Sequence, residues 1–275
     1  MKYVFILLII SSNVLLHGQT ISGVVFENNS ETPVEYVNIG IVGKNVGTVS
    51  DQNGKYSLQI NPENHNDSLK FSCIGFIPYI VKVSDFIRLS NGNVGLERKS
   101  YDITELVVRS KKLKQKTLGI TKKGKLNAIC YEHNTMASGG SELGILIKNK
   151  GKAFIKEINI NIAEFSFDTV FFRINFYKPL ANMEFENILN NPVYVSLSER
   201  EIVKNKITVD LRHLNLVIDD DFLVTYENIN FERNFTLCFS ACSFYKTYGR
   251  RTSQGTWEIP FNSGISISVL ADVER

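Results

Sequence analysis

Short segments in which apolar and polar residues alternate dominate the chain, and turn residues separate them. In residues 36–42, Val37, Ile39 and Ile41 share one face, because successive side chains of a strand point to opposite sides. The sequence DQNG at residues 51–54 favours a hairpin turn, since Asp bonds its own backbone and Asn-Gly tolerates positive φ. This pattern predicts a small β-sandwich near the start of the chain.

The same alternation returns in the second half of the chain. Ile158, Ile160 and Ile162 alternate with asparagines, and residues 170–177 follow the same period of two. Further apolar segments occupy residues 143–147, 193–197, 207–211, 222–229, 235–241 and 265–271. No run of ten or more residues has the 3.6-residue period of an amphipathic helix. About eight such strands predict a second sandwich of jelly-roll-like size, so the expected fold class is all-β with two β-sandwich domains.

The first 18 residues have the order of a secretory signal peptide. Lys2 precedes an apolar stretch over residues 4–16, and Gly18 supplies a small residue before the expected cleavage site. An uncleaved anchor is the alternative, but the apolar stretch is shorter than the roughly 20 residues that cross a bilayer. We therefore expect an exported protein, periplasmic or outer-membrane-associated, with Gln19 at its mature terminus and no transmembrane segment in the mature chain.

A lysine-rich segment separates the two predicted sandwiches. Residues 109–125 contain seven lysines and no acidic residue. A solvated interdomain linker is favoured by Gly119 and Gly124 and by the lack of an amphipathic period. Attraction to anionic lipopolysaccharide or phospholipid is the other interpretation. The expected organisation is a signal peptide at residues 1–18, a first domain at 19–108, a basic linker at 109–125 and a second sandwich at 126–275.

Three sequence segments of the first predicted sandwich resemble those of a known domain family. The sequences SGVV, PVEYVNIGI and GTVSDQNGKYSL, in this order, resemble the carboxypeptidase-regulatory-like domain, a transthyretin-type seven-stranded sandwich found in cell-envelope proteins of Bacteroidetes. The resemblance covers residues 21–108, and Gly75-Phe76 fits a step that is frequent in the family. It implies a non-catalytic domain in the cell envelope. The second half resembles an uncharacterised C-terminal sandwich that often follows this domain, which implies no activity.

Composition and missing motifs narrow the function classes. A formal net charge of +3 is too small to point to a nucleic-acid partner. A zinc carboxypeptidase needs an HxxE pair, but His65, His133 and His213 are each followed by other residues at that spacing. Glycine-rich phosphate-binding loops are also missing from the sequence. We therefore expect no cofactor, no metal site and no enzymatic activity.

The chain has four cysteines, and an exported protein could oxidise them. They are Cys73, Cys130, Cys238 and Cys242, which allow three pairings. Cys238 and Cys242 fall in one predicted strand about 13 Å apart, whereas a disulfide needs Cα atoms within about 7 Å. Buried thiols are the favoured interpretation.

Two groups of side chains in the second half are candidates for binding. Asp219, Asp220 and Asp221 could offer oxygen ligands to Ca²⁺, but a turn rich in Asp is the preferred interpretation. Aromatic and arginine side chains could form a surface that stacks on a sugar or peptide. These candidates are Arg173, Tyr177, Tyr248, Arg250, Arg251 and Trp257. The alternative places the tryptophan at the rim of the core and the last two arginines in a solvated turn.

The favoured function is a non-catalytic, exported cell-envelope module that binds a protein or glycan, as an accessory to outer-membrane uptake or surface assembly. The alternative is a glycan-directed hydrolase with its site in the second sandwich. Such an enzyme needs two carboxylates facing each other across a cleft. The available carboxylates are Glu142, Glu157, Glu164, Asp168, Asp210 and Glu227. A purely structural envelope component, with long exposed strand edges, is a third possibility.

Overall fold

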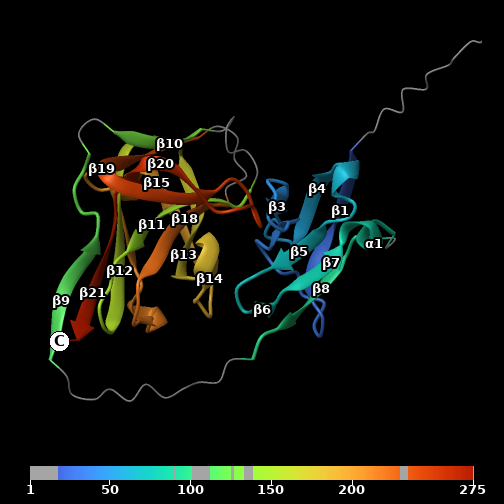
Figure 1. The fold of residues 1–275 in the computed structure, drawn as a ribbon, viewed down its shortest axis with the longest axis horizontal. Coiled ribbons are helices and arrows are strands. Elements are labelled where there is room, and N and C mark those ends of the chain that lie inside the picture. Colours follow the sequence, from blue (N-terminus) through green and yellow to red (C-terminus); the bar gives the residue numbers. More distant parts are fainter. Residues whose placement is uncertain are drawn as a thin grey trace, which may run out of the picture.

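The computed structural model describes residues 18–88, 91–100, 112–124, 127–132, 139–229 and 235–274. These residues form two β-structured domains that lie side by side (Figure 1). The N-terminal domain contains the described residues up to 100, and the C-terminal domain contains those from 112 onward. The predicted all-β fold class with two sandwiches is confirmed. Almost all of the predicted signal peptide, residues 1–17, lies outside the described part of the chain.

The N-terminal domain is a sandwich of two four-stranded sheets, in the orders β4-β1-β8-β6 and β3-β2-β5-β7. Its elements are β1 (Gln19–Glu27), β2 (Asn38–Ile41), β3 (Gly47–Val49), β4 (Lys55–Ile60), a 3-10 turn (Pro62–Asn64), β5 (Ser68–Ser72), β6 (Phe76–Ile77), β7 (Tyr79–Lys82), α1 (Val83–Arg88) and β8 (Val94–Arg98). β1 pairs antiparallel with β4 and parallel with β8. The last residues of the predicted first domain, 101–108, lie outside the described residues.

The alternating pattern places one face of each strand in the core of this domain. Phe71 is fully buried, and its ring centroid lies 5.4 Å from those of Tyr56 and Phe86. The predicted turn is present: the Asp51 carboxylate accepts hydrogen bonds from the backbone nitrogens of Asn53 at 2.8 Å and Lys55 at 2.9 Å. Each large apolar side chain buried in this way contributes about 1.5–3 kcal/mol.

In the C-terminal domain, the described strands form one continuous sheet in the order β14-β13-β18-β11-β19-β12-β21-β9, with five more strands attached beside this path. The strands are β9 (Leu113–Gly119), β10 (Ala128–Glu132), β11 (Ser141–Ile147), β12 (Ala153–Ser166), β13 (Thr169–Pro179), β14 (Phe185–Asn187), β15 (Val193–Ser198), β16 (Lys206–Asp210), β17 (Val217–Ile218), β18 (Phe222–Asn228), β19 (Thr236–Arg250), β20 (Glu258–Ile265) and β21 (Ile267–Glu274). Short 3-10 turns at Ala181–Met183, Glu199–Glu201 and Arg212–Leu214 connect some of them.

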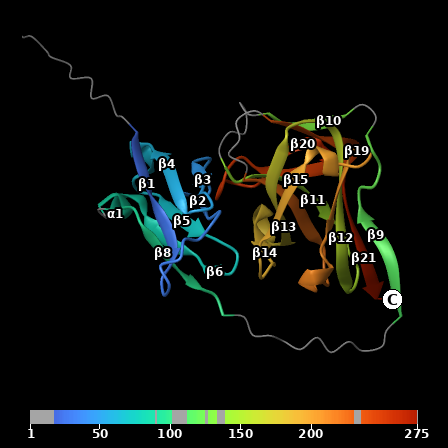
Figure 2. The ribbon, with the colours of Figure 1, turned by 180° about the vertical axis from the view of Figure 1, so that it is seen from behind.

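The long strand β19 lets this sheet close over a single core. Its first half pairs with β12 and its second half with β11, so one strand belongs to both layers. Phe172, Tyr226 and Phe239 meet between the layers, with ring centroids 4.7 and 5.1 Å apart. β13 and β14 face the N-terminal domain, whereas β12, β21 and β9 lie on the opposite side (Figure 2).

The predicted basic linker at residues 109–125 is wrong over much of its length. Leu113–Gly119 is strand β9, which pairs antiparallel with β21 from Leu113 opposite Glu274 to Gly119 opposite Ser268. Only the backbone of β9 is tied into the sheet, because its side chains are exposed except for the half-buried Leu118. Such an edge strand has no buried face, so its sequence shows no apolar alternation. Lysines are typical of edge strands, where they prevent pairing with a strand of another molecule.

The preference for free thiols is wrong for two of the four cysteines. Cys130 on β10 lies opposite Cys238 on β19, and the two form a disulfide with Cα atoms 3.9 Å apart. Cys73 and Cys242 are free. Sequence spacing could not show the pairing, because it depends on the register between strands 108 residues apart.

The acidic run at residues 219–221 connects β17 to β18, as the turn interpretation predicted. The Asp221 carboxylate accepts hydrogen bonds from the Lys148 ammonium at 2.6 Å and the Asn149 backbone nitrogen at 2.9 Å. Those bonds, together with the Lys148 charge, hold the pKa of Asp221 below its usual value. Among the described residues, no cluster of three or more His, Cys, Asp or Glu side chains could hold a metal ion, and no helix could span a membrane.

Candidate binding cleft between the domains

A loop of the C-terminal domain docks the two domains together. Residues 251–257, between β19 and β20, reach across to β2, β3 and β5 of the N-terminal domain (Figure 1). Ser253 donates a hydrogen bond to the Asn38 side chain at 3.0 Å, and Gln254 donates one to Ser72 at 2.7 Å. Ser253 is fully buried although it belongs to a connecting loop. The loop therefore fixes the position of one domain against the other.

Two glycines of the N-terminal domain make this docking possible. A Cβ atom on Gly47 would lie 2.3 Å from the carbonyl oxygen of Ser253, and one on Gly40 would lie 2.5 Å from the same atom. Real Cβ atoms do not approach backbone oxygens that closely, so any side chain here would push the loop away. Both glycines stand in the sequence segments that carried the family resemblance, and the second domain occupies the space they leave.

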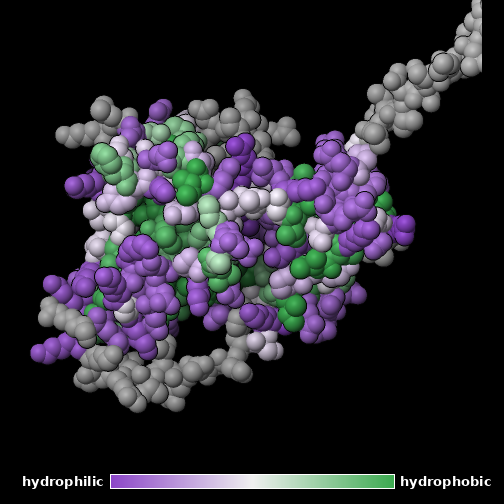
Figure 3. Space-filling model, viewed as in Figure 1, coloured by the Kyte–Doolittle hydropathy of each residue, from purple (hydrophilic) through white to green (hydrophobic). Residues whose placement is uncertain are grey.

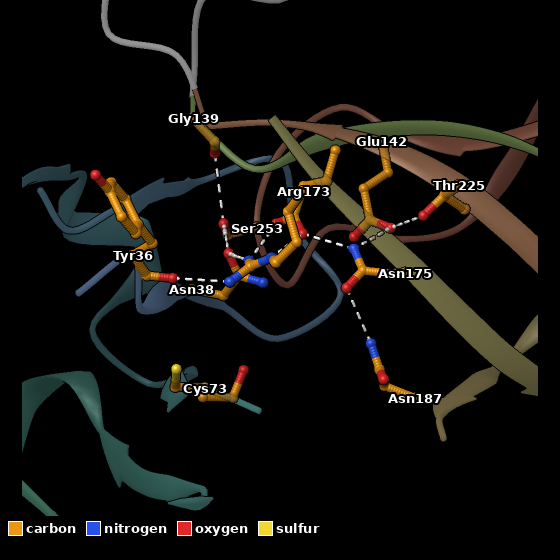
Figure 4. A network of polar contacts seen from close by, with 12 residues as sticks. Tyr36, Asn38, Cys73, Gly139, Glu142, Arg173, Asn175, Asn187, Thr225 and Ser253 are labelled. Atoms are coloured by element: carbon orange, nitrogen blue, oxygen red, sulfur yellow. Dashed lines mark hydrogen bonds and ion pairs between the residues drawn. The ribbon is translucent and has the colours of Figure 1, made fainter. Parts of the chain in front are cut away.

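Arg173 joins the interiors of the two domains. It lies on β13, is 1% exposed, and donates two parallel hydrogen bonds from Nε and Nη2 to the Glu227 carboxylate at 2.7 and 2.8 Å. Its other bonds cross to the N-terminal domain, to the Tyr36 carbonyl at 3.0 Å and the Asn38 side chain at 2.9 Å (Figure 4). Burial disfavours the guanidinium charge, but Glu227 outweighs it and raises the pKa of Arg173 well above its usual value.

A second ion pair lies beside the first. The carboxylate of Glu142, on β11, is fully buried and accepts hydrogen bonds from both Nε and Nη2 of Arg250. It also accepts bonds from the Thr225 hydroxyl at 2.7 Å and the Tyr177 hydroxyl at 2.9 Å. Every oxygen of this buried carboxylate is therefore satisfied, as burial of a charged group requires.

A single amide connects the two ion pairs. Asn175 Nδ2 donates to Glu227 at 2.7 Å and to Glu142 at 3.3 Å (Figure 4). Burial raises the pKa of Glu142 despite the opposing charge of Arg250. Burial acts on Glu227 in the same direction, but Arg173 outweighs it and lowers the pKa of that carboxyl. The buried Arg173, the partly buried Arg250 and two buried carboxylates thus form one hydrogen-bonded network.

Strand periodicity explains why the network forms on β13. Arg173, Asn175 and Tyr177 alternate along it with the buried apolar residues of the core. In the sheet, Arg173 lies opposite Glu227 of β18, which in turn lies opposite Glu142 of β11. Such a polar face would normally meet water. Here the N-terminal domain covers it, so these polar side chains are buried.

A cleft of about 660 Å³ opens beside the network, between the two domains. Its lining combines β5 and the segment after it with β13, β14 and the docking loop. About half of the lining residues are polar or charged: Asn38, Lys70, Ser72, Lys99, Arg173, Asn175, Glu186, Asn187, Arg250 and Gln254. Its apolar and aromatic lining includes Ile74, Phe76, Ile77, Pro78, Tyr177, Leu180, Phe185 and Leu189. Figure 3 shows hydrophilic and hydrophobic residues meeting along the junction of the domains.

The described lining of the cleft carries a small net positive charge, because Lys70 and Lys99 exceed Glu186 by one once both arginines are paired. The charges of Arg173 and Arg250 are offset by their carboxylate partners, and Glu186 is the one carboxylate in the described lining. Lys70, half-buried on β5, makes no ion pair with any residue in the described part of the chain. Burial lowers the pKa of Lys70, and the positive charge of Arg250 lowers it further. A nearby anion would oppose this lowering, because a negative charge stabilises the ammonium form.

The sequence of the N-terminal domain matches a known domain family. Residues 21–108 match the family model of the CarboxypepD_reg-like domain. The match supports the resemblance seen in the sequence, and its described part is the N-terminal sandwich. No curated protein matches the chain.

Three solved structures show distant likenesses to this chain. One, described as a carbohydrate-binding module of the β-sandwich superfamily, has 8% identity, covers 81% of this chain and 95% of its own, and gives a TM-score of 0.19. Structures of the infectious bursal disease virus Gt strain and of its VP2 subviral particle have 10% and 9% identity and TM-scores of 0.17 and 0.18. They cover 94% and 93% of this chain, and 64% of their own chains. TM-scores this low carry no argument about fold or function.

The structure brings five of the six predicted binding residues into one connected group, in which Trp257 contacts both Tyr177 and Arg250. Arg173, Tyr177 and Arg250 belong to the buried network described above. Trp257 and Tyr248 form an aromatic cluster around Phe185 of β14, with ring centroids 5.0 and 6.0 Å from it. The Arg250 guanidinium lies 5.2 Å from the Trp257 ring. Only Arg251 is separate, in an exposed ion pair with Glu258.

The predicted stacking surface is therefore wrong for the residues of the network. Arg173 is 1% exposed and Tyr177 is 6% exposed, so neither offers an open face on which a sugar or peptide could stack, although both border the cleft. The solvated-turn alternative is also wrong for Arg250, whose side chain is 11% exposed. The sequence could not show that the CarboxypepD_reg-like domain covers this face. Lys70 and Phe185 were missed because nothing in their strands distinguishes them from residues facing water.

Among the predicted carboxylates, only Glu142 and Glu227 come together at the interface. Both are fully buried, both bond Asn175, and neither lines the cleft. The two carboxylates do not face each other across an open cleft, which is the arrangement that a glycoside hydrolase needs.

Proposed function

We propose that this protein is an exported, non-catalytic component of the cell envelope that binds an acidic glycan in the cleft between its domains. The match of residues 21–108 to the CarboxypepD_reg-like domain supports an envelope role. The Cys130–Cys238 disulfide supports export, because disulfides persist in oxidising compartments. The observation that carries the proposal is the cleft of small net positive charge to which both domains contribute.

The size and chemistry of the cleft favour a glycan segment. Its volume of about 660 Å³ lies within the range of sites that enclose small ligands, roughly 300–1,000 Å³. Phe76 and Phe185, one from each domain, offer rings against which a sugar can pack. Lys70 offers a cation to a carboxylate or sulfate group. An acidic glycan fits these features, because its ring faces are apolar and its substituents are anionic.

The burial of the carboxylates favours binding without catalysis. A general acid or nucleophile must reach the glycosidic bond. Glu142 and Glu227 are both 0% exposed and each is held by an arginine. Residues of the network, Arg173, Asn175 and Arg250, line the cleft in front of them. A bound glycan would therefore be separated from Glu142 and Glu227, and Glu186 is the carboxylate of the described lining that it could meet.

Replacing Lys70 tests the binding site. We expect Lys70→Met to weaken binding of a short oligogalacturonate by about 10- to 100-fold, the range expected for a lost charge-assisted hydrogen bond. Thermal stability should stay unchanged or rise, since the substitution removes a half-buried cation next to Arg250. Both quantities can be measured by titration calorimetry and thermal unfolding.

The matched control is Lys82→Met, which removes an exposed lysine from β7 of the same domain. It should change affinity less than twofold, and a neutral galactose oligomer of equal length should bind weakly to every variant. Equal affinity for the acidic and neutral oligomers, or full affinity in Lys70→Met, would contradict the proposed site. Release of shorter sugars from the bound oligomer would contradict the non-catalytic role.

A further inference from the structure

Phe244 has no role within the fold that explains its position. Its side chain is 102% exposed, and its backbone has φ of +69°, a region that bulky residues rarely adopt. Tyr245 follows it and is 52% exposed. Water contact with a large aromatic ring and an unfavourable backbone both cost stability. A contact outside the chain would account for the arrangement.

The bulge that presents these aromatic residues is firmly built. The pairing of β19 with β20 is irregular between Ser243 and Thr247. The Thr247 hydroxyl donates to the Ser263 carbonyl at 2.6 Å and accepts from the Ile265 backbone nitrogen at 3.1 Å. Opposite the bulge, Gly264 leaves room for Tyr245, since a Cβ there would lie 2.5 Å from the tyrosine Cβ. The aromatic pair is therefore held in place at its base.

Two lysine-bearing segments lie beside the bulge. The Cys242 thiol donates to the Lys122 carbonyl at 3.3 Å, which brings residues 122–123 next to β19. Lys123 Nζ in turn donates to the Lys204 carbonyl at 2.5 Å. Val203, 64% exposed, stands at the turn before β16. We name these three segments, residues 122–123, 203–206 and 244–246, the basic aromatic patch.

Charge on the basic aromatic patch is strongly one-sided. It carries five lysines: Lys122, Lys123, Lys204, Lys206 and Lys246. A hollow of about 550 Å³ opens among Val203 and three of these lysines, Lys123, Lys204 and Lys206. Glu201 is the carboxylate that lines this hollow in the described chain, and it accepts hydrogen bonds from the Ser198 backbone nitrogen and hydroxyl, both at 2.8 Å. The patch therefore combines three exposed apolar or aromatic side chains, Val203, Phe244 and Tyr245, with five lysines.

From this geometry we infer that the basic aromatic patch binds the surface of an anionic phospholipid bilayer. Aromatic and aliphatic tips enter the headgroup boundary, while surrounding lysines meet the phosphates. The patch shares no residue with the cleft lining. β16 pairs with β12, on the side of the C-terminal domain that faces away from the N-terminal domain (Figure 2). Membrane binding would thus leave the cleft open to a glycan.

Vesicle sedimentation of the chain beginning at Gln19 tests this inference. The protein should bind vesicles of phosphatidylcholine that contain about one-third phosphatidylglycerol, and should not bind phosphatidylcholine alone. Binding should fall in 1 M salt, where the screening length is about 3 Å. Lys204→Glu with Lys206→Glu should weaken binding at least 25-fold, because each lysine near an anionic surface contributes about fivefold. Phe244→Ser should weaken it by about tenfold or more.

Matched controls lie on the N-terminal domain. Lys55→Glu with Lys82→Glu changes the net charge equally at exposed sites, and Ile80→Ser removes an apolar side chain that is 57% exposed. Both should change binding less than twofold. Equal binding to neutral vesicles, no binding to anionic ones, or equal losses in the patch and control variants would overturn the inference. Binding to a purified envelope protein with no binding to vesicles would overturn it as well.

Discussion

Replacing Arg173 by methionine is expected to lower the free energy of unfolding by about 3–5 kcal/mol. The substitution leaves the Glu227 carboxylate buried without its partner, and it also removes the bonds to Tyr36 and Asn38 across the domain interface. An uncompensated buried charge is far more costly than the loss of a surface ion pair. Urea unfolding followed by fluorescence and circular dichroism would measure the change.

Two further variants test whether the unpaired charge of Glu227 causes the loss of stability in Arg173→Met. Arg173→Met combined with Glu227→Gln should recover at least half of the lost stability, since no unpaired charge then remains in the interior. Arg251→Met removes the neighbouring exposed ion pair with Glu258, and should cost less than about 1 kcal/mol. A loss below 1 kcal/mol in Arg173→Met, or no recovery in the double variant, would show that the network does not hold the interface.

Breaking the Cys130–Cys238 disulfide is expected to cost about 2–5 kcal/mol of stability. The bridge closes a loop whose ends are 108 residues apart, and the constraint that a disulfide places on the unfolded chain increases with loop length. Replacing both cysteines by serine, or adding a strong reductant to the unchanged protein, should lower the unfolding free energy by the same amount.

The two remaining cysteines supply the control. Replacing Cys73 and Cys242 by serine leaves the bridge intact, so the reductant should still destabilise that variant. In the variant without the bridge, the reductant should have no further effect. Four titratable thiols in the unreduced, denatured protein would contradict the disulfide, and so would unchanged stability after reduction.

The strands with strict alternation could be predicted from the sequence because their pattern is local. Residues 170–177 show both faces of β13, including the polar one that carries Arg173 and Tyr177. What covers that face could not be predicted, because it depends on a domain more than 100 residues earlier in the chain. The sequence pattern of a strand is the same whether its polar face contacts water or is covered by another domain. The burial of Arg173 and Tyr177 therefore could not be predicted from their own strand.

Other features that the sequence did not predict also depend on contacts between distant segments of the chain. β9 is polar throughout, and only its pairing with β21 makes it a strand. Cys130 meets Cys238 because β10 pairs with β19 in one register. Lys70 resembles an ordinary surface lysine next to the core residues Leu69 and Phe71. Its place beside Arg250 is visible only once both domains are positioned.

Hydrogen exchange with and without a short oligogalacturonate tests most directly whether the cleft binds its ligand between the two domains. Our account predicts slower exchange in two segments at once: residues 70–78 of the N-terminal domain and residues 177–189 of the C-terminal domain. Residues on β9 and β21, on the opposite side, should not change. Protection confined to one domain, or no protection at a saturating ligand concentration, would contradict a binding site shared by both domains.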